Sequence, residues 1–398
     1  MSTPLPLAPT AAPASPAPPV ILWGAPVGLY TGKVRSYLRK QGIAFVERLP
    51  SDPEFQRQVM PAVQRFINPV VRLPGGQLVQ DTTDIIDHFE HSGQARFSVY
   101  PRGPLQRVVA LALDLLGGEG LVRAAMHFRW SYRAHNEAFL RHEFGLSFRA
   151  AGLPQAAIDQ QLDGFMGYLN AYLPKLGIRA QSTEAVEAAY YALLSALDAH
   201  FRVQPYVLGG LPTVADFGFI ANLYAHLGRD PYPSMQMKLQ APSVYRFTER
   251  MMASDADVPE FPQSQPALPD DDTVPETLGA VAQCMAQDYL PELQAIVRSL
   301  DVWLAQQGEI APMAPVSAKP SIRMLTTAEF SLRGTPMQSM AGPYTLYMLQ
   351  RVTDAFAALG GADQQRVHAW FSAHGLQELL TLRASRRVAR RNHIEVWE

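Results

Sequence analysis

Two hydroxyl-bearing residues lie in a glycine-flanked turn, where a short apolar run meets the first long helical pattern. Tyr30 and Thr31 follow Gly28 in the stretch GLYTG, and the helical pattern TGKVRSYLRKQG begins at Thr31. Free N–H groups and the dipole at the start of a helix favour negative charge. Thr31 therefore has two equally weighted interpretations, as the N-cap of this helix or as a hydroxyl that stabilises an anion.

A second polar helix start lies further along the chain. Asp81 and Thr82 directly precede the apolar helical pattern of TTDIIDHFEH. This pair can be a plain helix start, or it can bind a ligand. In the second case the carboxylate accepts from an ammonium group, while the hydroxyl and the helix N-terminus bind an anion.

The elements around these residues alternate between strand and helix. Residues 20–93 read as strand, helix, strand, helix, strand, strand and helix, with VILWG, AFVERL, PVVRL and LVQD as the strands. This order predicts a mixed sheet covered by helices. Residues 104–252 contain only helical periodicity, and Thr213 with Asp216 forms a capping-box pair at one helix start.

The remaining segments have a different composition. Residues 1–19 are rich in Pro and Ala and carry no charge, which predicts a disordered tail. Residues 253–271 form an acidic, Pro-rich linker, and residues 272–398 are again mostly helical in pattern. Arginines from Arg383 to Arg391 recur at helical spacing, which predicts a basic stripe on a helix. This stripe could bind an acidic partner or nucleic acid, but we favour ion pairs with the acidic linker.

Composition narrows the class of protein. The net charge of −2 gives no overall attraction to nucleic acid or anionic lipid, and no apolar run is long enough for a membrane span. The single cysteine, Cys284, cannot form an internal disulfide, and we interpret it as buried and inert. We therefore expect a cytoplasmic protein without nucleic-acid, membrane or metal partners, and the excess of Arg over Lys suggests a bacterial source.

Taken in order, four motifs resemble the glutathione S-transferase superfamily. LYTGKVRSYLRKQGI is similar to the family's first helix, and NPV, from Asn68 to Val70, lies where the family has a cis-proline before its third strand. QDTTDII takes the place of the family's Glu-Ser pair, and LPTVADFGF is similar to its buried N-capping box. The resemblance covers about residues 20–252.

The resemblance implies a fold in three parts. An α/β thioredoxin-like N-terminal domain that binds glutathione, over residues 20–93, is followed by an all-α glutathione-transferase-type domain over residues 104–252. Residues 272–398 would be an additional, mostly helical C-terminal extension, found only in an extended subgroup. The resemblance also implies a homodimer.

The resemblance further implies that glutathione is a cosubstrate and that no metal takes part. Glutathione has carboxylates at both ends and a thiol of pKa about 8.5, so binding must hold anions and stabilise a thiolate. Asn68 and Pro69, before the third strand, would pair with the cysteinyl part of glutathione. Asp81 and Thr82, at the start of the later helix, would bind the γ-glutamyl end of glutathione. By position in the family pattern, we assign binding to Gly28, Asn68, Pro69, Val70, Asp81 and Thr82, and we assign thiol activation to Thr31 and Tyr30 as the nearest hydroxyl-bearing residues.

Position 28 departs from the family pattern. Gly28 stands where many classes of the family have a catalytic serine or cysteine, so the usual hydroxyl or thiol is missing. Thr31, Tyr30 or backbone N–H groups could stabilise the thiolate for attack on an apolar electrophile. Alternatively, the chain is a non-catalytic binding or assembly module with a glutathione-transferase-like fold. A glutathione-dependent disulfide reductase is disfavoured, because no cysteine lies in the turn.

The electrophile would lie against the helical domain. The stretch AAMHFRWSY, from Ala124 to Tyr132, combines aromatic residues with His127 and Arg129. Core packing is the more common role of such a stretch, and a wall of the substrate pocket is the alternative.

Overall fold

The N-terminal domain is a four-stranded mixed sheet with helices packed on it. The computed structural model describes residues 19–398, so the predicted tail falls almost entirely outside the described residues. The strand order is β2-β1-β3-β4, with β1 parallel to β2 and antiparallel to β3. The elements of this domain are β1 (Val20–Trp23), α1 (Leu29–Lys40), β2 (Phe45–Arg48), η1 (Phe55–Val59), α2 (Met60–Ala62), β3 (Val70–Arg72), β4 (Leu78–Gln80) and α3 (Thr82–His91).

The predicted order of strands and helices in this domain is confirmed. All four residues of β1 are buried, as expected for a central strand that is covered on both faces. Around Pro61 the chain forms a π-helical segment and one short helical turn instead of a regular helix. The proline ring and its missing N–H explain this irregularity.

The second domain is built from helices alone, as predicted. Its capping box is confirmed, because Asp216 accepts a hydrogen bond of 2.7 Å from the Thr213 N–H at the start of α9. Burial raises the pKa of Asp216 to about 6. The main helices are α4 (Pro104–Leu115), α5 (Val122–Trp130), α6 (Arg133–Ala150), α7 (Gln155–Asn170), α8 (Thr183–Phe201), α9 (Val214–Ala225), α10 (Pro231–Gln240) and α11 (Pro242–Met252), with the π-turn η2 (Leu116–Gly120) and the 3-10 turns η3 (Leu173–Leu176) and η4 (Ala180–Ser182) between them.

The first two domains share a tightly packed seam. Helix α1 packs against α9, and Gly32 in α1 lies against the side chains of Tyr224 and Ala225. A buried ion pair of 2.8 Å joins Lys33 in α1 to Asp114 in α4. Because both charges are removed from water, each depends on the other, which fixes α1 relative to the helical domain.

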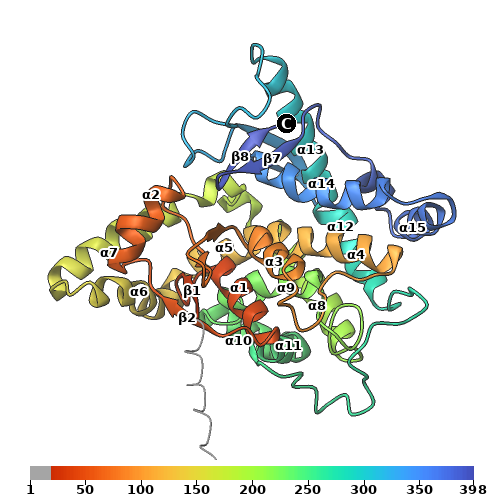
Figure 1. Ribbon diagram of the computed structural model, residues 1–398, viewed down its shortest axis with the longest axis horizontal. Helices are drawn as coiled ribbons and strands as arrows, with labels where there is room; N and C mark the ends of the chain where they lie inside the picture. Colours follow the sequence, from red (N-terminus) through yellow and green to blue (C-terminus); the bar gives the residue numbers. More distant parts are fainter. Residues whose placement is uncertain (1–18) are drawn as a thin grey trace, which may run out of the picture.

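The C-terminal extension combines the predicted helices with two β-hairpins that the sequence analysis missed. Figure 1 shows it, in cyan to blue, lying across α3 and α4 of the first two domains. Its apolar residues join the same continuous core as those of the other domains. Its elements are α12 (Leu278–Asp288), α13 (Leu290–Ala305), β5 (Thr326–Leu332), β6 (Thr335–Ala341), α14 (Pro343–Ala357), α15 (Gly361–Ala373), η5 (Gln377–Leu380), β7 (Val388–Arg391) and β8 (Ile394–Trp397).

The predicted basic helix near the C-terminus is wrong. The chain from Val388 to Arg391 is strand β7, and Arg387 pairs with Asp354 in α14 rather than with the linker. At the end of the linker, Asp272 accepts from the first N–H groups of α4 at 3.0 and 2.9 Å and pairs with Arg366. Asp272 thus caps α4, whose own N-cap residue, Gly103, has no side chain.

Metal-ligand clusters and membrane-spanning helices are both absent from the described residues. Residues 19–398 contain no group of three or more His, Cys, Asp or Glu side chains arranged to hold a metal ion. In the same range, none of the helices has the length and hydropathy needed to cross a bilayer.

Candidate functional site

The first candidate site is the start of α1. The helix begins at Leu29 with Gly28 as its N-cap residue, so the interpretation of Thr31 as the N-cap is wrong by three positions. Gly28 is extended, with φ −81° and ψ 126°, and no side chain caps the helix. The first N–H groups of α1 therefore have no side-chain acceptor from the N-cap, which leaves their partial positive charge for an anion.

Thr31 is completely buried, and its hydroxyl points to Asn68. The Thr31 Oγ1 donates to the Asn68 Oδ1 at 3.4 Å. This contact orients the amide of Asn68 and leaves its Nδ2 group free to donate elsewhere. The predicted cis peptide between Asn68 and Pro69 is confirmed. Val70 lies inside the sheet, paired with Trp23 on one side and Gln80 on the other.

A large cavity opens beside Gly28 and Asn68. It has a volume of about 850 Å³ and lies between the first domain and helices α5, α6 and α7. Its walls are rich in apolar and aromatic side chains, which suits an apolar ligand. The hydrophobic lining residues are Ala25, Val27, Phe66, Met126, Trp130, Phe144, Phe148, Ala151, Phe165 and Leu169.

Arg129 and Glu143, the charged residues in the wall of this cavity, are each paired with a residue outside the cavity lining. Arg129 forms two hydrogen bonds of 2.6 and 2.7 Å with Asp230, and Arg229 binds Glu143 at 2.8 Å. His127 is fully buried, with ring contacts to Glu187 and Ser131, and does not line the cavity. The stretch AAMHFRWSY therefore supplies both core packing and cavity wall.

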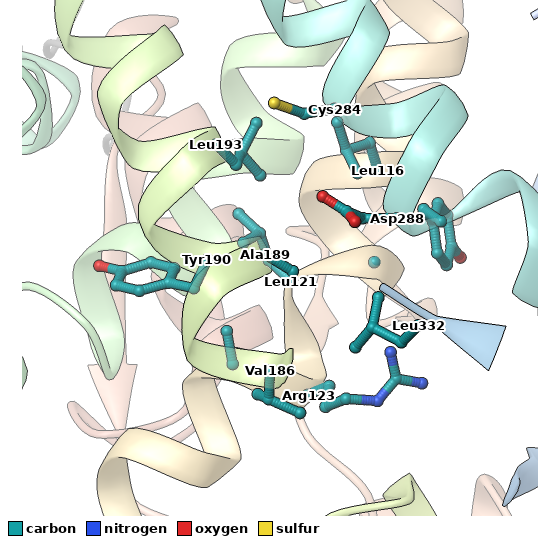
Figure 2. Close-up of a pocket in the computed structure, with 13 residues that line it drawn as sticks. Leu116, Leu121, Arg123, Val186, Ala189, Tyr190, Leu193, Cys284, Asp288 and Leu332 are labelled. Carbon is teal, nitrogen blue, oxygen red and sulfur yellow. The ribbon is translucent and has the colours of Figure 1, made fainter. Parts of the chain in front are cut away.

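A second, much smaller cavity lies between the helical domain and the extension. Figure 2 shows Cys284 and Asp288 of α12 facing Leu193 and Ala189 of α8 across it. Its volume of about 50 Å³ leaves room for about one or two water molecules. Burial raises the pKa of the Cys284 thiol, so this cysteine is a poor nucleophile at neutral pH.

Tyr30 turns away from the large cavity and toward the helical domain. Its hydroxyl donates to Glu119 Oε1 at 3.0 Å, in the π-turn η2. Burial, with a further contribution from Glu119, raises the pKa of Tyr30 well above its usual value, so the phenol keeps its proton. Burial likewise raises the pKa of Glu119 to about 7, although the charge of Arg323 acts in the opposite direction.

The second candidate site, at the start of α3, is covered by the extension. Asp81 is the N-cap of α3, with φ +88°, and accepts from the Thr83 N–H at 3.0 Å. The same carboxylate oxygen accepts from the hydroxyl of Tyr344, at the start of α14, at 2.9 Å. Asp81 and Thr82 are both buried, at 8% and 3% exposure. The structure therefore separates the two predicted sites into an open one and a covered one.

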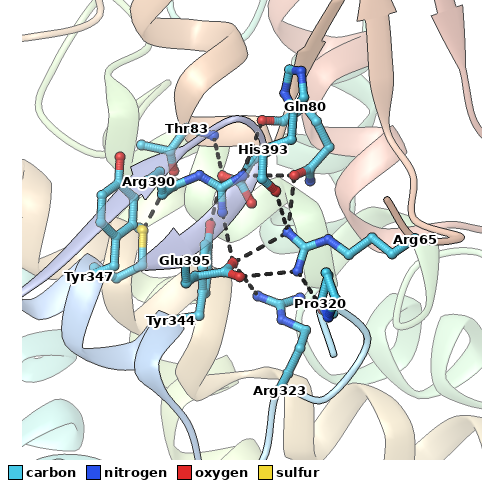
Figure 3. A network of polar contacts seen from close by, with 12 residues as sticks. Arg65, Gln80, Thr83, Pro320, Arg323, Tyr344, Tyr347, Arg390, His393 and Glu395 are labelled. Carbon is cyan, nitrogen blue, oxygen red and sulfur yellow. Dashed lines mark hydrogen bonds and ion pairs between the residues drawn. The ribbon is translucent and has the colours of Figure 1, made fainter. Parts of the chain in front are cut away.

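A polar network next to Asp81 fastens the extension to the first domain. Figure 3 shows Glu395 of β8 surrounded by the guanidinium groups of Arg65, Arg323 and Arg390. Arg65 lies 3.0 Å and Arg390 2.8 Å from the Glu395 carboxylate, while Arg323 is 3.8 Å away. The charge of Glu395 is thus already balanced by two close partners. Arg323 instead lies over the ring of Tyr344, 4.8 Å from its centre.

Three of these polar residues were not singled out from the sequence. Glu119 lies in the short stretch GGEG, and Arg323 and Tyr344 lie in the extension, outside every recognised motif. The one available signal was a lone acidic residue between two apolar helical patterns. No sequence spacing connects it to Arg323 or Tyr344, because the fold alone brings these residues together.

Comparison with known proteins agrees with this architecture. Residues 162–255 match the family model of the glutathione S-transferase C-terminal domain. None of the curated proteins matches the chain. The matched residues lie mostly in the helical domain, and the cis-proline before β3 is the one that the resemblance implied.

Several solved structures are similar to part of this chain at low identity. Glutathione transferase GSTFuA3 from Phanerochaete chrysosporium is 15% identical, with a TM-score of 0.41, over 60% of this chain and 98% of its own. Beta-etherase LigF from Sphingobium sp. strain SYK-6 is 14% identical, with a TM-score of 0.41, over 61% and 97%. A glutathione S-transferase from Methylobacterium radiotolerans, in complex with glutathione sulfonate, is 18% identical, with a TM-score of 0.37, over 64% and 99%.

Proposed function

We propose that this protein binds glutathione along its thioredoxin-like domain and transfers it to an apolar electrophile held in the large cavity. The observation that carries this proposal is that the cavity reaches both Gly28 and Asn68, at the uncapped start of α1. An anion-favouring helix end and an aromatic-lined cavity thus share one opening. Nucleophile and electrophile could meet there in a favourable geometry.

Thiolate stabilisation would come from the backbone and from one side-chain amide. The uncapped N-terminus of α1 supplies N–H groups and the positive end of the helix dipole. Asn68 lines the cavity, and its Nδ2 group would supply a further donor. Lowering the thiol pKa by one unit requires about 1.4 kcal/mol, which is within the range of one hydrogen bond to a charged group.

Thr31 then acts through Asn68 rather than on sulfur. Its hydroxyl is buried and holds the Asn68 Oδ1, so the amide nitrogen is the end of Asn68 that would serve the ligand. Tyr30, whose hydroxyl is held by Glu119, would contribute little to the chemistry. The substituent at position 28 is not needed for this arrangement, which explains how a glycine can replace the usual hydroxyl.

Calorimetric titration with glutathione, combined with a conjugation assay on a chloronitrobenzene, tests the proposal. Asn68→Ala should lower kcat/KM by about tenfold or more, because one preorganised donor is lost. Thr31→Ala should produce a smaller loss, and Tyr30→Phe almost none. The matched control is Asn170→Ala, at the exposed end of α7 outside the cavity lining. Wild-type rates in Asn68→Ala would contradict the mechanism.

The contact between Tyr344 and Asp81 favours a second candidate function. If the extension permanently excludes the γ-glutamyl group, the chain is a non-catalytic binding module that uses the large cavity alone. In that case the wild-type protein would bind apolar ligands without binding glutathione. The same titration distinguishes the two functions.

The proposed activity fits a cytoplasmic homodimer. Reduced glutathione and a single unpaired cysteine fit a cytoplasmic protein. The resemblance to the family predicts a homodimer, and sedimentation velocity of the full chain measures whether the extension permits one.

A further inference from the structure

One buried histidine in the wall of the large cavity has incomplete hydrogen bonding. His226 is the C-cap residue of α9, lines the cavity and is 5% exposed. Its Nδ1 lies 3.4 Å from the carbonyl oxygen of Ala125. Because a carbonyl oxygen can only accept, Nδ1 carries the proton and Nε2 carries a lone pair. Within residues 19–398, Nε2 has no hydrogen-bond partner.

Two other buried histidines of the helical domain show what complete hydrogen bonding looks like. Both ring nitrogens of His127 and both ring nitrogens of His200 have hydrogen-bond partners in the described chain. Neither of these two histidines lines the large cavity. Buried polar atoms are normally paired, because an unpaired one costs free energy. Among these three histidines, the unused nitrogen belongs to the one that a ligand in the cavity can reach.

The ring of His226 is neutral. Burial, with a further contribution from the charge of Arg129, lowers the pKa of His226 well below its usual value. The ring therefore has no positive charge at neutral pH with which to attract an anion. Its Nε2 is instead a hydrogen-bond acceptor for a group that carries a proton.

The charged residues of the cavity wall are already committed to other groups. All three side-chain nitrogens of Arg129 donate hydrogen bonds, to Asp230 and to backbone carbonyl groups. Glu143 accepts from Arg229 at 2.8 Å. A charged ligand would have to compete with these buried pairs, and breaking such a pair is costly. The wall therefore favours a ligand without charge.

Resting on the proposed function, we propose that His226 is a specificity residue whose Nε2 accepts a hydrogen bond from a hydroxyl group of the electrophile. The substrate class is accordingly a neutral aromatic molecule with a hydroxyl substituent, such as a phenol. The aromatic side chains of the wall bind its rings, and His226 selects for the hydroxyl group. A methyl ether of the same molecule has no proton to donate and leaves Nε2 unpaired.

Fluorescence titration of the full chain with 2-naphthol and with 2-methoxynaphthalene tests the proposal. The two compounds differ only in a methyl group that replaces the hydroxyl proton, and neither is an electrophile, so the titration measures binding alone. The preference is the Kd of the ether divided by the Kd of the naphthol. It should fall by about tenfold in His226→Leu, because the buried hydroxyl group then lacks its acceptor. An unchanged preference in His226→Leu would overturn the proposal.

Two amide variants separate the roles of the two ring nitrogens. His226→Asn can keep a donor near the position of Nδ1, for the carbonyl of Ala125, but has no acceptor at the position of Nε2, so the preference should be lost. His226→Gln can place its amide oxygen near the position of Nε2 and should retain part of the preference.

The matched control is His127→Asn, the same change at a buried histidine outside the cavity lining. This variant should keep the preference within about twofold of the wild type. Thermal melts of every variant verify folding. If His127→Asn loses as much of the preference as His226→Asn, the effect is not specific to the cavity and the proposal is overturned.

The outcomes also separate this proposal from the proposed function. A preference that depends on His226, in a protein that does not transfer glutathione, would overturn the transferase activity and leave the hydroxyl-binding role of His226 intact. Transfer of glutathione by the wild type, with an unchanged preference in His226→Leu, would overturn only the role of His226. A wild-type protein that binds neither naphthalene compound would overturn the role of His226 and that of the cavity as the binding site of the electrophile.

Discussion

The starts of α1 and α3 use the same property of a helix in opposite ways. At α1 the N-cap is Gly28, no side chain satisfies the first N–H groups, and the large cavity lies directly beside them. At α3 the N-cap is Asp81, whose carboxylate satisfies an N–H group and is held by a tyrosine of the extension. The comparison teaches that a missing side chain keeps one helix end free for a ligand, while a charged cap ties the other into the fold.

Removing the cap of α3 should have the largest effect on stability. Asp81→Ala loses the N-cap and leaves the buried hydroxyl of Tyr344 without its acceptor, which should lower the free energy of unfolding by about 2–3 kcal/mol. Urea unfolding measures this change. Asp81→Asn keeps an acceptor oxygen and should cost less than about 1 kcal/mol. Equal stability of both variants would show that the cap at α3 is dispensable.

Narrowing the cavity beside α1 should weaken binding of the electrophile and leave binding of glutathione unchanged. Gly164 in α7 lines the cavity, and no atom lies within 4 Å of the position where a Cβ would be added. Gly164→Leu should raise the KM for a bulky electrophile by about tenfold and leave the KM for glutathione unchanged. It should not reduce stability, because leucine is a better helix former than glycine.

Gly167→Leu is the matched control for this experiment. Gly167 is in the same helix, has the same open surroundings and does not line the cavity. The two variants should be equally folded in thermal melts. If both change the KM of the electrophile to the same extent, the cavity is not its binding site.

Glu119 should make the stability of the folded protein depend on pH. The folded protein holds its proton up to a pKa of about 7, whereas an unfolded glutamate releases it near its ordinary value of about 4.5. Between these values the folded state binds more protons, so the contribution of Glu119 to stability falls as pH rises. Thermal melts from pH 4.5 to 7.5 should decline less steeply in Glu119→Gln than in the wild type. Parallel curves would contradict this assignment, since the buried Asp216 declines in both proteins.

Adding a side-chain cap to α1 should make its start similar to that of α3. Among these variants it should have the smallest effect on stability. The backbone of Gly28 suits serine, and a new N-cap should stabilise the protein by at most about 1 kcal/mol. The added Cβ would lie 3.0 Å from the Thr31 hydroxyl, which offsets part of this gain. Gly28→Ser should also lower the pKa of bound glutathione, read from thiolate absorbance in a pH titration. An unchanged thiol pKa would show that the backbone alone already provides the stabilisation.

The sequence predicted the first two domains well because their signals are local. The alternating strand and helix patterns, the cis-proline motif and the capping box of Thr213 and Asp216 each span a few residues, and the structure contains all of them. The N-cap of α1 was placed three residues too late, at Thr31 instead of Gly28. Glycine gives no positive capping signal, while Thr31 is a favourable cap residue.

The extension and its contacts with the site could not be predicted in the same way. Strands β5, β6 and β7 mix buried with exposed residues, so they lack the fully buried pattern of β1, and β8 alone is mostly buried. The contact between Tyr344 and Asp81 joins residues 263 positions apart. No local pattern encodes such a contact, because it depends on how the whole extension packs against α3 and α4.

The ion pair between Arg65 and Glu395 joins residues separated by 330 positions. During synthesis Arg65 leaves the ribosome long before Glu395, and until β8 has been made its charge has no carboxylate of that strand beside it. The N-terminal domain can therefore reach its final arrangement only after β8 has emerged and packed against it. A chain that stops before β8 would keep an unbalanced cationic cluster, a natural target for quality-control proteases.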